Sequence, residues 1–318
     1  MPSLPLEPVL IHDFPLGTYV NSLAIRKQDG DILVTLASIP QVYLISTRDE
    51  FEATKVATIP GVQAALSIVE TQVNEFYVVA GNLSVTEKTS EKGSYSVWKL
   101  DMRKKDRSVE PAKVADVTDA ALLDKATPLD STRLLIPDSI LGSVWMLNIK
   151  SGQSRVVLND TASMSPVTPS GVGINSVGIH GDFLYYDNSQ KGSISRVPID
   201  LQTATPVGPV EPLFQNNDTV FAQGFAFRGN SLWLANGFDE INLFSGATSP
   251  QISTPLATEV VAGSPNETTF VGPSDCKFGR KPLDLKRGSL YVTTTGKSSE
   301  GYVYGGSLFR VDLGPHLS

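Results

Sequence analysis

The sequence has little of what most binding and catalytic classes require. Its single cysteine, Cys276, excludes an intrachain disulfide and a cysteine-based metal site. Basic residues number 26 against 33 acidic ones, a net charge of −7, which argues against nucleic acid or an anionic membrane as partner. No apolar run approaches the ~18 residues of a membrane span. A Gly-rich phosphate loop and a G-x-S-x-G nucleophile elbow are also missing, so nucleotide cofactors and serine hydrolysis are not indicated.

What the chain does contain is one unit repeated six times. The clearest copy is GVGINSVGIHGDFLYYDNSQKGSISRVPID at 171–200, in which short β-branched and aromatic runs alternate with turn residues. The copies open near residues 21, 64, 124, 175, 223 and 275, which is a period of 43 to 60 residues. Four short strands and their turns fill that length, as in one propeller blade.

We therefore predict an all-β fold, a six-bladed β-propeller of four-stranded antiparallel blades that forms a single domain over residues 1–318. The run at 8–14 precedes the first blade and is expected to close the sixth blade as its outer strand, which removes a free edge. The runs at 54–59 and 154–158 are expected outer strands, and Thr118–Lys125 is the one short helix candidate. A β-sandwich is the alternative, but it would not explain the repeat.

Polar residues open most of the predicted inner strands. Inner strands surround the channel of a propeller, so these residues are expected to form a ring at one channel mouth. The predicted ring consists of Asn21, Ala64 (or Gln63), Asp124, Asn175, Gln223 and Asp275. Two interpretations stay open: the ring binds a small molecule, or it binds only strand backbone and channel water.

Other side chains are expected beside this ring. Met164 and Phe221 precede inner strands, and Tyr302 and Tyr304 lie in a late loop, so all four are candidates for an apolar substrate-binding wall. Lys125 adjoins the ring and either polarises a substrate carbonyl or is a solvated surface lysine.

Structural roles are expected for several other conspicuous residues. The histidines lie far apart in the repeat and have no metal-ligand spacing. Cys276 is expected to be a buried thiol, and His180 a structural residue at the opposite mouth. Packing between blades is expected of the aromatic residues in second strands, namely Tyr185, Tyr186, Trp233 and Tyr291.

The text at 175–188, NSVGIHGDFLYYDN, and the late segment PSDCKFG at 273–279 resemble the gluconolactonase/regucalcin and strictosidine-synthase-like propellers. The resemblance implies a divalent metal, calcium, at the channel mouth, held by a glutamate, asparagines and an aspartate. Asn175 matches a family asparagine, whereas Asn21 stands in place of the glutamate and Gln223 in place of the aspartate. Amides supply dipoles rather than charge, so this departure favours a site without metal.

Were a metal present, the ligands would be Asp124, Asn175 and Asp275. The strictosidine-synthase branch uses a glutamate for acid/base work, and no ring position carries one. In length, degenerate metal positions and lack of nucleophiles, the chain is more similar to the fungal hetero-Diels–Alderases of tropolone–sesquiterpenoid biosynthesis. That resemblance implies a cofactor-free pericyclase that joins an o-quinone methide to a sesquiterpene alkene.

The roles that this reaction needs point to two sets of residues, of which Asn175, Gln223, Asp124 and Asp275 are expected to be catalytic and Asn21 to bind substrate. Asn21, Asn175 and Gln223 would donate hydrogen bonds to the heterodiene oxygen, while Asp124 and Asp275 would orient a hydroxyl or move a proton. Two alternatives stay open. One is a metal-dependent lactonase or related hydrolase, and the other is a non-catalytic propeller that binds a protein through loops such as 81–93.

Expected partners are small apolar polyketide–terpenoid substrates, and localisation stays open. The first residues, MPSLPLEP, lack the basic and apolar regions of a signal peptide, which favours the cytoplasm by default. Four glycosylation sequons in predicted loops instead favour a secretory route with a trimmed signal; they begin at Asn82, Asn159, Asn217 and Asn266.

Overall fold

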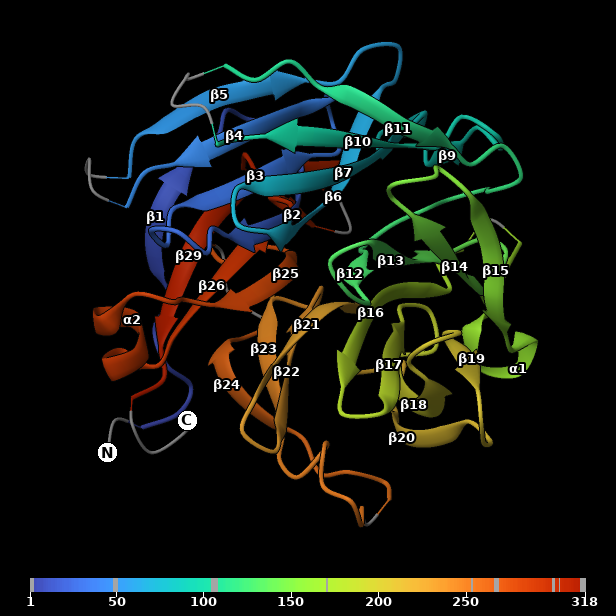
Figure 1. Ribbon diagram of the computed structural model, residues 1–318. Helices are drawn as coiled ribbons and strands as arrows, with labels where there is room; N and C mark the ends of the chain where they lie inside the picture. Colours follow the sequence, from blue (N-terminus) through green and yellow to red (C-terminus); the bar gives the residue numbers. More distant parts are fainter. Residues whose placement is uncertain are drawn as a thin grey trace.

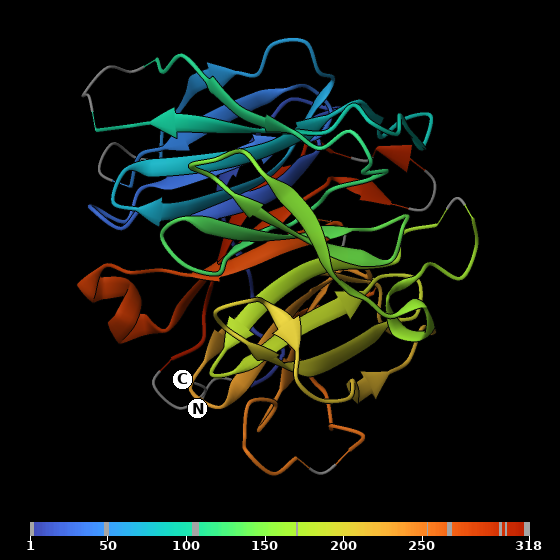
Figure 2. The ribbon, with the colours of Figure 1, turned by 45° about the vertical axis from the view of Figure 1, so that its right-hand side comes forward.

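The computed structural model contains six antiparallel sheets of four or five strands that follow one another around a common axis in chain order (Figure 1). It describes residues 3–47, 51–103, 108–169, 171–252, 254–265, 269–298, 301–302 and 304–314. Each sheet is one blade, and the predicted six-bladed propeller is confirmed. Both views place the two short helical segments, at 161–164 and 282–287, at the periphery of the ring (Figures 1 and 2).

The strands of the first three blades, from the channel outward, have the following bounds. Blade 1 contains β2 (Val20–Ile25), β3 (Ile32–Leu36), β4 (Gln41–Ile45) and β5 (Ala53–Thr58). Blade 2 contains β6 (Ala64–Gln72), β7 (Glu75–Gly81), β10 (Ser96–Asp101) and β11 (Ala112–Asp116), with the hairpin β8 (Leu83–Ser84) and β9 (Thr89–Ser90) between its second and third strands. Blade 3 contains β12 (Thr127–Pro128), β13 (Arg133–Asp138), β14 (Ser143–Asn148) and β15 (Ser154–Asn159).

The last three blades follow the same plan. Blade 4 contains β16 (Ile174–His180), β17 (Phe183–Asn188), β18 (Ser193–Asp200) and β20 (Glu211–Gln215), and β19 (Thr205–Pro206) pairs with the end of β18. Blade 5 contains β21 (Ala222–Arg228), β22 (Ser231–Asn236), β23 (Glu240–Phe244) and β24 (Glu259–Gly263). Blade 6 contains β25 (Pro273–Phe278), β26 (Ser289–Thr294), β29 (Ser307–Asp312) and β1 (Val9–Asp13), with the hairpin β27 (Lys297–Ser298) and β28 (Gly301–Tyr302).

The ring is closed by its first strand, as predicted. Strand β1 pairs antiparallel with β29, in a register that sets Val9 opposite Arg310 and Asp13 opposite Ser307. The outer edge of blade 6 is therefore paired with a strand from the other end of the chain, which ties the first and last blades together. The predicted outer strands at 54–59 and 154–158 are present as β5 and β15.

The predicted helix at 118–125 is wrong. Its backbone N–H groups at Ala121 and Leu122 donate to the carboxylate of Asp138, at 2.8 and 3.1 Å, so a side chain takes the donors that a helix would need. The segment instead forms the irregular inner edge of blade 3. The two helices described are α1 (Thr161–Met164) and α2 (Pro282–Arg287). Within the described ranges, no helix has the length and apolar character that crossing a bilayer requires.

The core consists of apolar layers between neighbouring blades. The predicted packing role of the second-strand aromatics is confirmed: Trp233 lies between blades 5 and 6, Tyr185 between blades 4 and 5, and Tyr186 between blades 3 and 4. Tyr291 packs against residues of blade 1. Cys276 is fully buried, as predicted, and burial raises the pKa of its thiol to about 12, so it is not a nucleophile.

A β-bulge near the start of five inner strands positions the site. The pairing register skips one residue in blades 1, 2, 5 and 6 and two in blade 4. The residues left out of the ladder are Asn21, Leu66, Asn175 with Ser176, Gln223 and Ser274. Bulged residues leave the regular pleat, and two of them, Asn21 and Asn175, both bind Asp124, whereas Leu66 packs in the apolar core. We call the channel end at which the inner strands begin the mouth.

Candidate functional site at the channel mouth

In two blades the bulged residue is not the residue named from the sequence. In blade 2 the bulged residue is Leu66 rather than Ala64 or Gln63, and Ala64 pairs regularly with Gly81. In blade 6 it is Ser274, and Asp275 re-enters the ladder opposite Thr293. A bulge adds one residue to a strand without changing its composition, so the sequence pattern could not fix these positions.

Four polar side chains from three blades form a closed cluster at the mouth, which we call the Asp124 cluster. It consists of Asn21, Asp124, Lys125 and Asn175, each at most 8% exposed. Asp124 Oδ1 accepts from Asn21 Nδ2 at 2.9 Å and from Lys125 Nζ at 3.4 Å, and Oδ2 accepts from Asn175 Nδ2 at 3.1 Å. Lys125 Nζ also donates to Asn175 Oδ1 at 2.8 Å. These four residues, all named from the sequence as lying in or beside the ring, lie together in the structure.

The cluster corrects the interpretation of Lys125 as a solvated surface lysine. Only 3% of Lys125 is exposed, because its ammonium is held by a carboxylate and an amide oxygen. Burial raises the pKa of Asp124, and the charge of Lys125 and the hydrogen bond from Asn21 oppose that shift. The cluster is therefore a compact neutralised pair whose donors and acceptors are mostly used internally.

Asp275 and Lys277 form a second ion pair beside it in the channel. Asp275 Oδ1 accepts from Lys277 Nζ at 2.7 Å and from the Cys276 backbone N–H at 2.8 Å, and Oδ2 accepts from Ser22 Oγ at 2.9 Å. Burial opposes the charge of Lys277, but the neighbouring Asp275 holds the pKa of this ammonium above its ordinary value. The pair links blades 1 and 6, and Lys277 reaches Phe225 O of blade 5 at 3.2 Å.

A divalent metal on Asp124, Asn175 and Asp275 does not fit this arrangement. Each carboxylate already carries an ammonium, and Asn175 Oδ1 accepts from Lys125. A hard cation needs free oxygen ligands and uncompensated negative charge, and both would require displacing the lysines. Among the described residues, moreover, no three His, Cys, Asp or Glu side chains gather closely enough to hold a metal ion.

The predicted apolar wall is only partly at the mouth. Phe221 is half-buried in the loop before β21, and Tyr304, which is 42% exposed, lies in the loop before β29. Met164 is instead fully buried between blades 3 and 4, because Asn188 Nδ2 binds the carbonyl groups of residues 163, 164 and 165 and holds α1 against the blade. The side chain of Tyr302 lies outside the described residues.

The loops that surround the mouth carry further exposed apolar side chains. Six large ones come from different loops on this side of the ring, namely Leu16, Ile39, Leu141, Val167, Phe238 and Tyr304. The mouth therefore has a polar floor and an apolar rim. This combination suits a ligand that is mostly apolar and carries a few oxygen atoms.

Sequence reasoning missed the residues that hold these loops. The last residue of the second strand in three successive blades is polar and fully buried: Asp138, Asn188 and Asn236. At the mouth, each of these side chains binds backbone groups of the loop before the first strand of its blade and of the loop after the second strand. The signal was present in the repeat, since IPD, YYDN and LAN all end an apolar run with Asp or Asn.

Replacing Asn236 by alanine is expected to lower the free energy of unfolding by about 2 kcal/mol, because the backbone groups of Thr219, Phe221 and Phe238 lose their buried partner. Chemical denaturation of the variant measures the loss. Asn230→Ala, at an exposed turn, is the matched control and is expected to change stability by less than ~0.5 kcal/mol. Equal effects in the two variants would contradict the assigned role.

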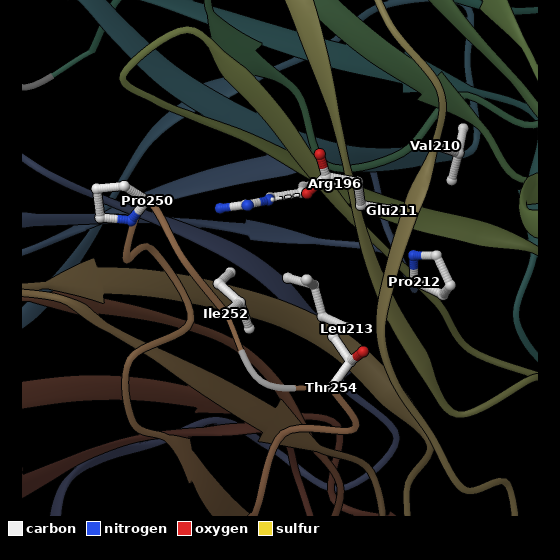
Figure 3. Close-up of a pocket in the computed structure, with 8 residues that line it drawn as sticks. All are labelled: Arg196, Val210, Glu211, Pro212, Leu213, Pro250, Ile252 and Thr254. Carbon is white, nitrogen blue, oxygen red and sulfur yellow. Dashed lines mark hydrogen bonds and ion pairs between the residues drawn. The ribbon is translucent and has the colours of Figure 1, made fainter.

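A cavity of about 460 Å³ lies away from the mouth, between the outer strand of blade 4 and the loop after β23 (Figure 3). Its one buried cation, Arg196, donates to Glu211 Oε2 at 2.7 Å and to Ser249 O at 3.1 Å. The guanidinium also stacks on Phe183, with Cζ 4.2 Å from the ring centroid. These contacts give Arg196 a structural role in joining blades 4 and 5.

The fold and its site define a six-bladed β-propeller with a lysine-neutralised channel mouth. A luciferin-regenerating enzyme has the same fold, with a TM-score of 0.68, 13% sequence identity, and coverage of 96% of this chain and 94% of that one. A calcium-binding regucalcin from Agrobacterium tumefaciens gives a TM-score of 0.67 at 14% identity with the same coverage. At such identities the likeness shows the fold alone.

Two fungal proteins are more similar in sequence, and both bear the provisional name hetero-Diels-Alderase. One, from a Phoma species, is 26% identical over 92% of this chain and 87% of its own length. The other, from Sarocladium schorii, is 28% identical over 91% of this chain and 78% of its own length. No family model matches the chain. The predicted resemblance is confirmed both in fold, to regucalcin-like propellers, and in sequence, to proteins named hetero-Diels-Alderase. The names of the sequence relatives indicate an enzyme.

Proposed function

We propose that the protein is a cofactor-free biosynthetic enzyme that joins a tropolone-type o-quinone methide to a sesquiterpene alkene by an intermolecular hetero-Diels–Alder reaction at the mouth. The observation that carries this proposal is the similarity, over more than nine-tenths of the chain, to two proteins of that name. The rim and floor of the mouth support it, because the two substrates would be mostly hydrocarbon with few oxygen atoms.

The reaction asks little covalent chemistry of the protein. The heterodiene and the alkene form one C–C and one C–O bond in a cycloaddition that retains every atom and needs no leaving group, nucleophile or redox partner. Holding two partners in register supplies up to ~7–11 kcal/mol of the barrier in favourable cases. A hydrogen-bond donor on the heterodiene oxygen stabilises the negative charge that develops there.

The residues of the ring differ in how many of their hydrogen-bond donors are still free. Both hydrogens of the Asn21 amide are used, by Leu66 O at 2.6 Å and by Asp124. Asn175 Nδ2 uses one hydrogen on Asp124 and retains the other. The carboxylates of Asp124 and Asp275 already accept from several donors, so a role for them in orienting a hydroxyl requires a rearrangement of the cluster. Asn175 and Gln223 are therefore the ring donors that we assign to substrate.

The test is a coupling assay with an o-quinone methide generated in situ and a sesquiterpene alkene, with product resolved by chiral chromatography. The proposal predicts faster product formation than in buffer and one dominant enantiomer. Gln202→Met, an exposed change outside the mouth, should leave both readouts unchanged. Racemic product at the rate seen in buffer would contradict the proposal.

A further inference from the structure

Gln223 differs from the other amides of the ring in its hydrogen bonding. Only 7% of the residue is exposed, and among the described residues no group forms a hydrogen bond with its amide. Its counterparts at the bulges of blades 1 and 4 do have partners: Asn21 uses both hydrogens of its amide, and Asn175 uses its amide oxygen and one hydrogen. An amide without protein partners at the mouth is available to bind a ligand there.

The amide of Gln223 has no hydrogen-bond partner among the described residues, but it is accessible to solvent. Some described side-chain atoms, such as Thr71 Oγ1 and Trp233 Nε1, are inaccessible to solvent and also lack a hydrogen-bond partner. The amide atoms of Gln223 do not belong to this group. The small exposed fraction of this residue therefore includes the polar end of the side chain. A ligand at the mouth can reach one acceptor oxygen and two donor hydrogens there.

One phenylalanine ring borders the same space as the Gln223 side chain, and a second ring lies beside the first. A Cβ placed on Gly237 would lie 2.9 Å from Phe221 Cδ1 and 3.5 Å from Gln223 Cγ, so both side chains border the space beside this glycine. The ring of Phe238, which is 40% exposed, lies 6.1 Å from the ring of Phe221 at an angle of 46°. Gln223 and Phe221 thus border one space on blade 5, and the ring of Phe238 lies beside that of Phe221.

The loops that carry these two rings are fixed in advance by one buried residue. Asn236 Oδ1 accepts from the backbone N–H groups of Phe221, at 2.9 Å, and of Phe238, at 3.1 Å. Both phenylalanine-bearing loops are therefore anchored to the same atom at the end of β22. A surface that is ordered before the ligand arrives loses less conformational entropy on binding.

We propose that Gln223, Phe221 and Phe238 form the subsite for the planar, oxygen-bearing substrate, and that the Gln223 amide binds adjacent carbonyl and hydroxyl oxygens of its ring. We call this the blade-5 subsite. The amide matches such a pair by donating to the carbonyl and accepting from the hydroxyl. Both ammonium groups in the channel, Lys125 and Lys277, are paired with carboxylates, so the subsite favours an uncharged ligand. The choice of substrate rests on the proposed function.

The test measures binding of tropolone, a stable planar hydroxyketone, by ligand-observed NMR and calorimetry at a pH at which tropolone is uncharged. Gln223→Met keeps the length of the side chain and removes its hydrogen bonds, so the Kd should rise about tenfold or more. Phe238→Leu should raise it severalfold. Gln202→Met, an exposed change outside the mouth, should leave it unchanged.

A second variant tests the same subsite if Gln223→Met folds poorly. Gly237→Ala would place its Cβ against the ring of Phe221 and should also weaken tropolone binding. Wild-type affinity in both Gln223→Met and Gly237→Ala would overturn the subsite, as would failure of the wild-type protein to bind tropolone at millimolar concentration.

The coupling assay separates this proposal from the function on which it rests. Tropolone binding that depends on Gln223, in a wild-type protein that gives no coupling, would sustain the subsite and overturn the cycloaddition. Coupling by the Gln223→Met variant with wild-type kcat and KM would overturn the subsite and sustain the cycloaddition.

Discussion

Replacing Lys125 by methionine is expected to lower the free energy of unfolding by about 3–5 kcal/mol. The substitution removes the ammonium that compensates Asp124 and leaves a carboxylate that is 8% exposed with only two amide donors. Burial already raises the pKa of this carboxyl, so loss of the neighbouring positive charge should raise it further. Chemical denaturation at neutral pH measures the effect.

Two companion variants make this prediction specific. Lys113→Met removes an ion pair in which the side chains of Lys113 and Asp116 are 46% and 53% exposed, and it should change stability by less than ~1 kcal/mol. The double variant Asp124→Leu/Lys125→Met should recover part of the loss, because replacing both partners leaves no isolated buried charge. A loss in Lys125→Met no greater than that in Lys113→Met would contradict the assignment of Lys125 to the cluster.

Replacing Asp187 by asparagine is expected to stabilise the protein at neutral pH by about 3 kcal/mol. Asp187 is fully buried, and burial raises its pKa from 3.8 to about 6. It accepts from the Ser176 backbone N–H at 2.8 Å and from Ser176 Oγ at 2.6 Å. Asparagine keeps the first contact through its oxygen and can donate to the hydroxyl, so both contacts survive without a charge.

The direction of the pH dependence follows from the raised pKa. A carboxyl that binds its proton more tightly in the folded state favours folding below about pH 3.8, and this contribution is lost as the pH rises through about 6. The advantage of Asp187→Asn should therefore be near zero at pH 3.5 and grow until about pH 7.

Asp200 provides a control of opposite sign. It is exposed, and the backbone N–H groups of Thr203 and Gln202 lower its pKa, so Asp200→Asn should lose stability at neutral pH. Unfolding midpoints measured from pH 3.5 to 7.5 test both variants. A gain in Asp187→Asn that does not vary with pH would contradict the explanation based on ionisation.

The architecture could be predicted because the sequence pattern of one blade occurs six times in the chain. Each copy repeats the apolar run, turn and aromatic run of a blade, so one ambiguous copy is corrected by the other five. The closing strand β1 followed from a β-type run with no blade of its own. The aromatic packing followed from the position of Trp233 and Tyr185 in second strands, whose side chains must face neighbouring blades.

The site was less predictable because it depends on features that the repeat does not encode. The bulge falls on Leu66 in blade 2 and on Ser274 in blade 6, close to but not at the residues named from the sequence. The burial of Lys125 depends on Asn175, which lies 50 residues away and comes close only when the ring closes. Met164 was misplaced because a single buried side chain, Asn188, folds its loop against the blade. The unpaired state of Gln223 is likewise visible only once the partners of its neighbours are known.

The most direct test of a metal-independent coupling site measures metal content and coupling rate on one sample of wild-type protein, before and after chelation. Because Lys125 and Lys277 neutralise the channel carboxylates, we expect no stoichiometric divalent ion, and we expect the rate and the enantiomeric ratio of the product to be unchanged by the chelator. A stoichiometric ion whose removal abolishes coupling, and whose return restores it, would contradict the central claim and favour a metal-dependent propeller enzyme.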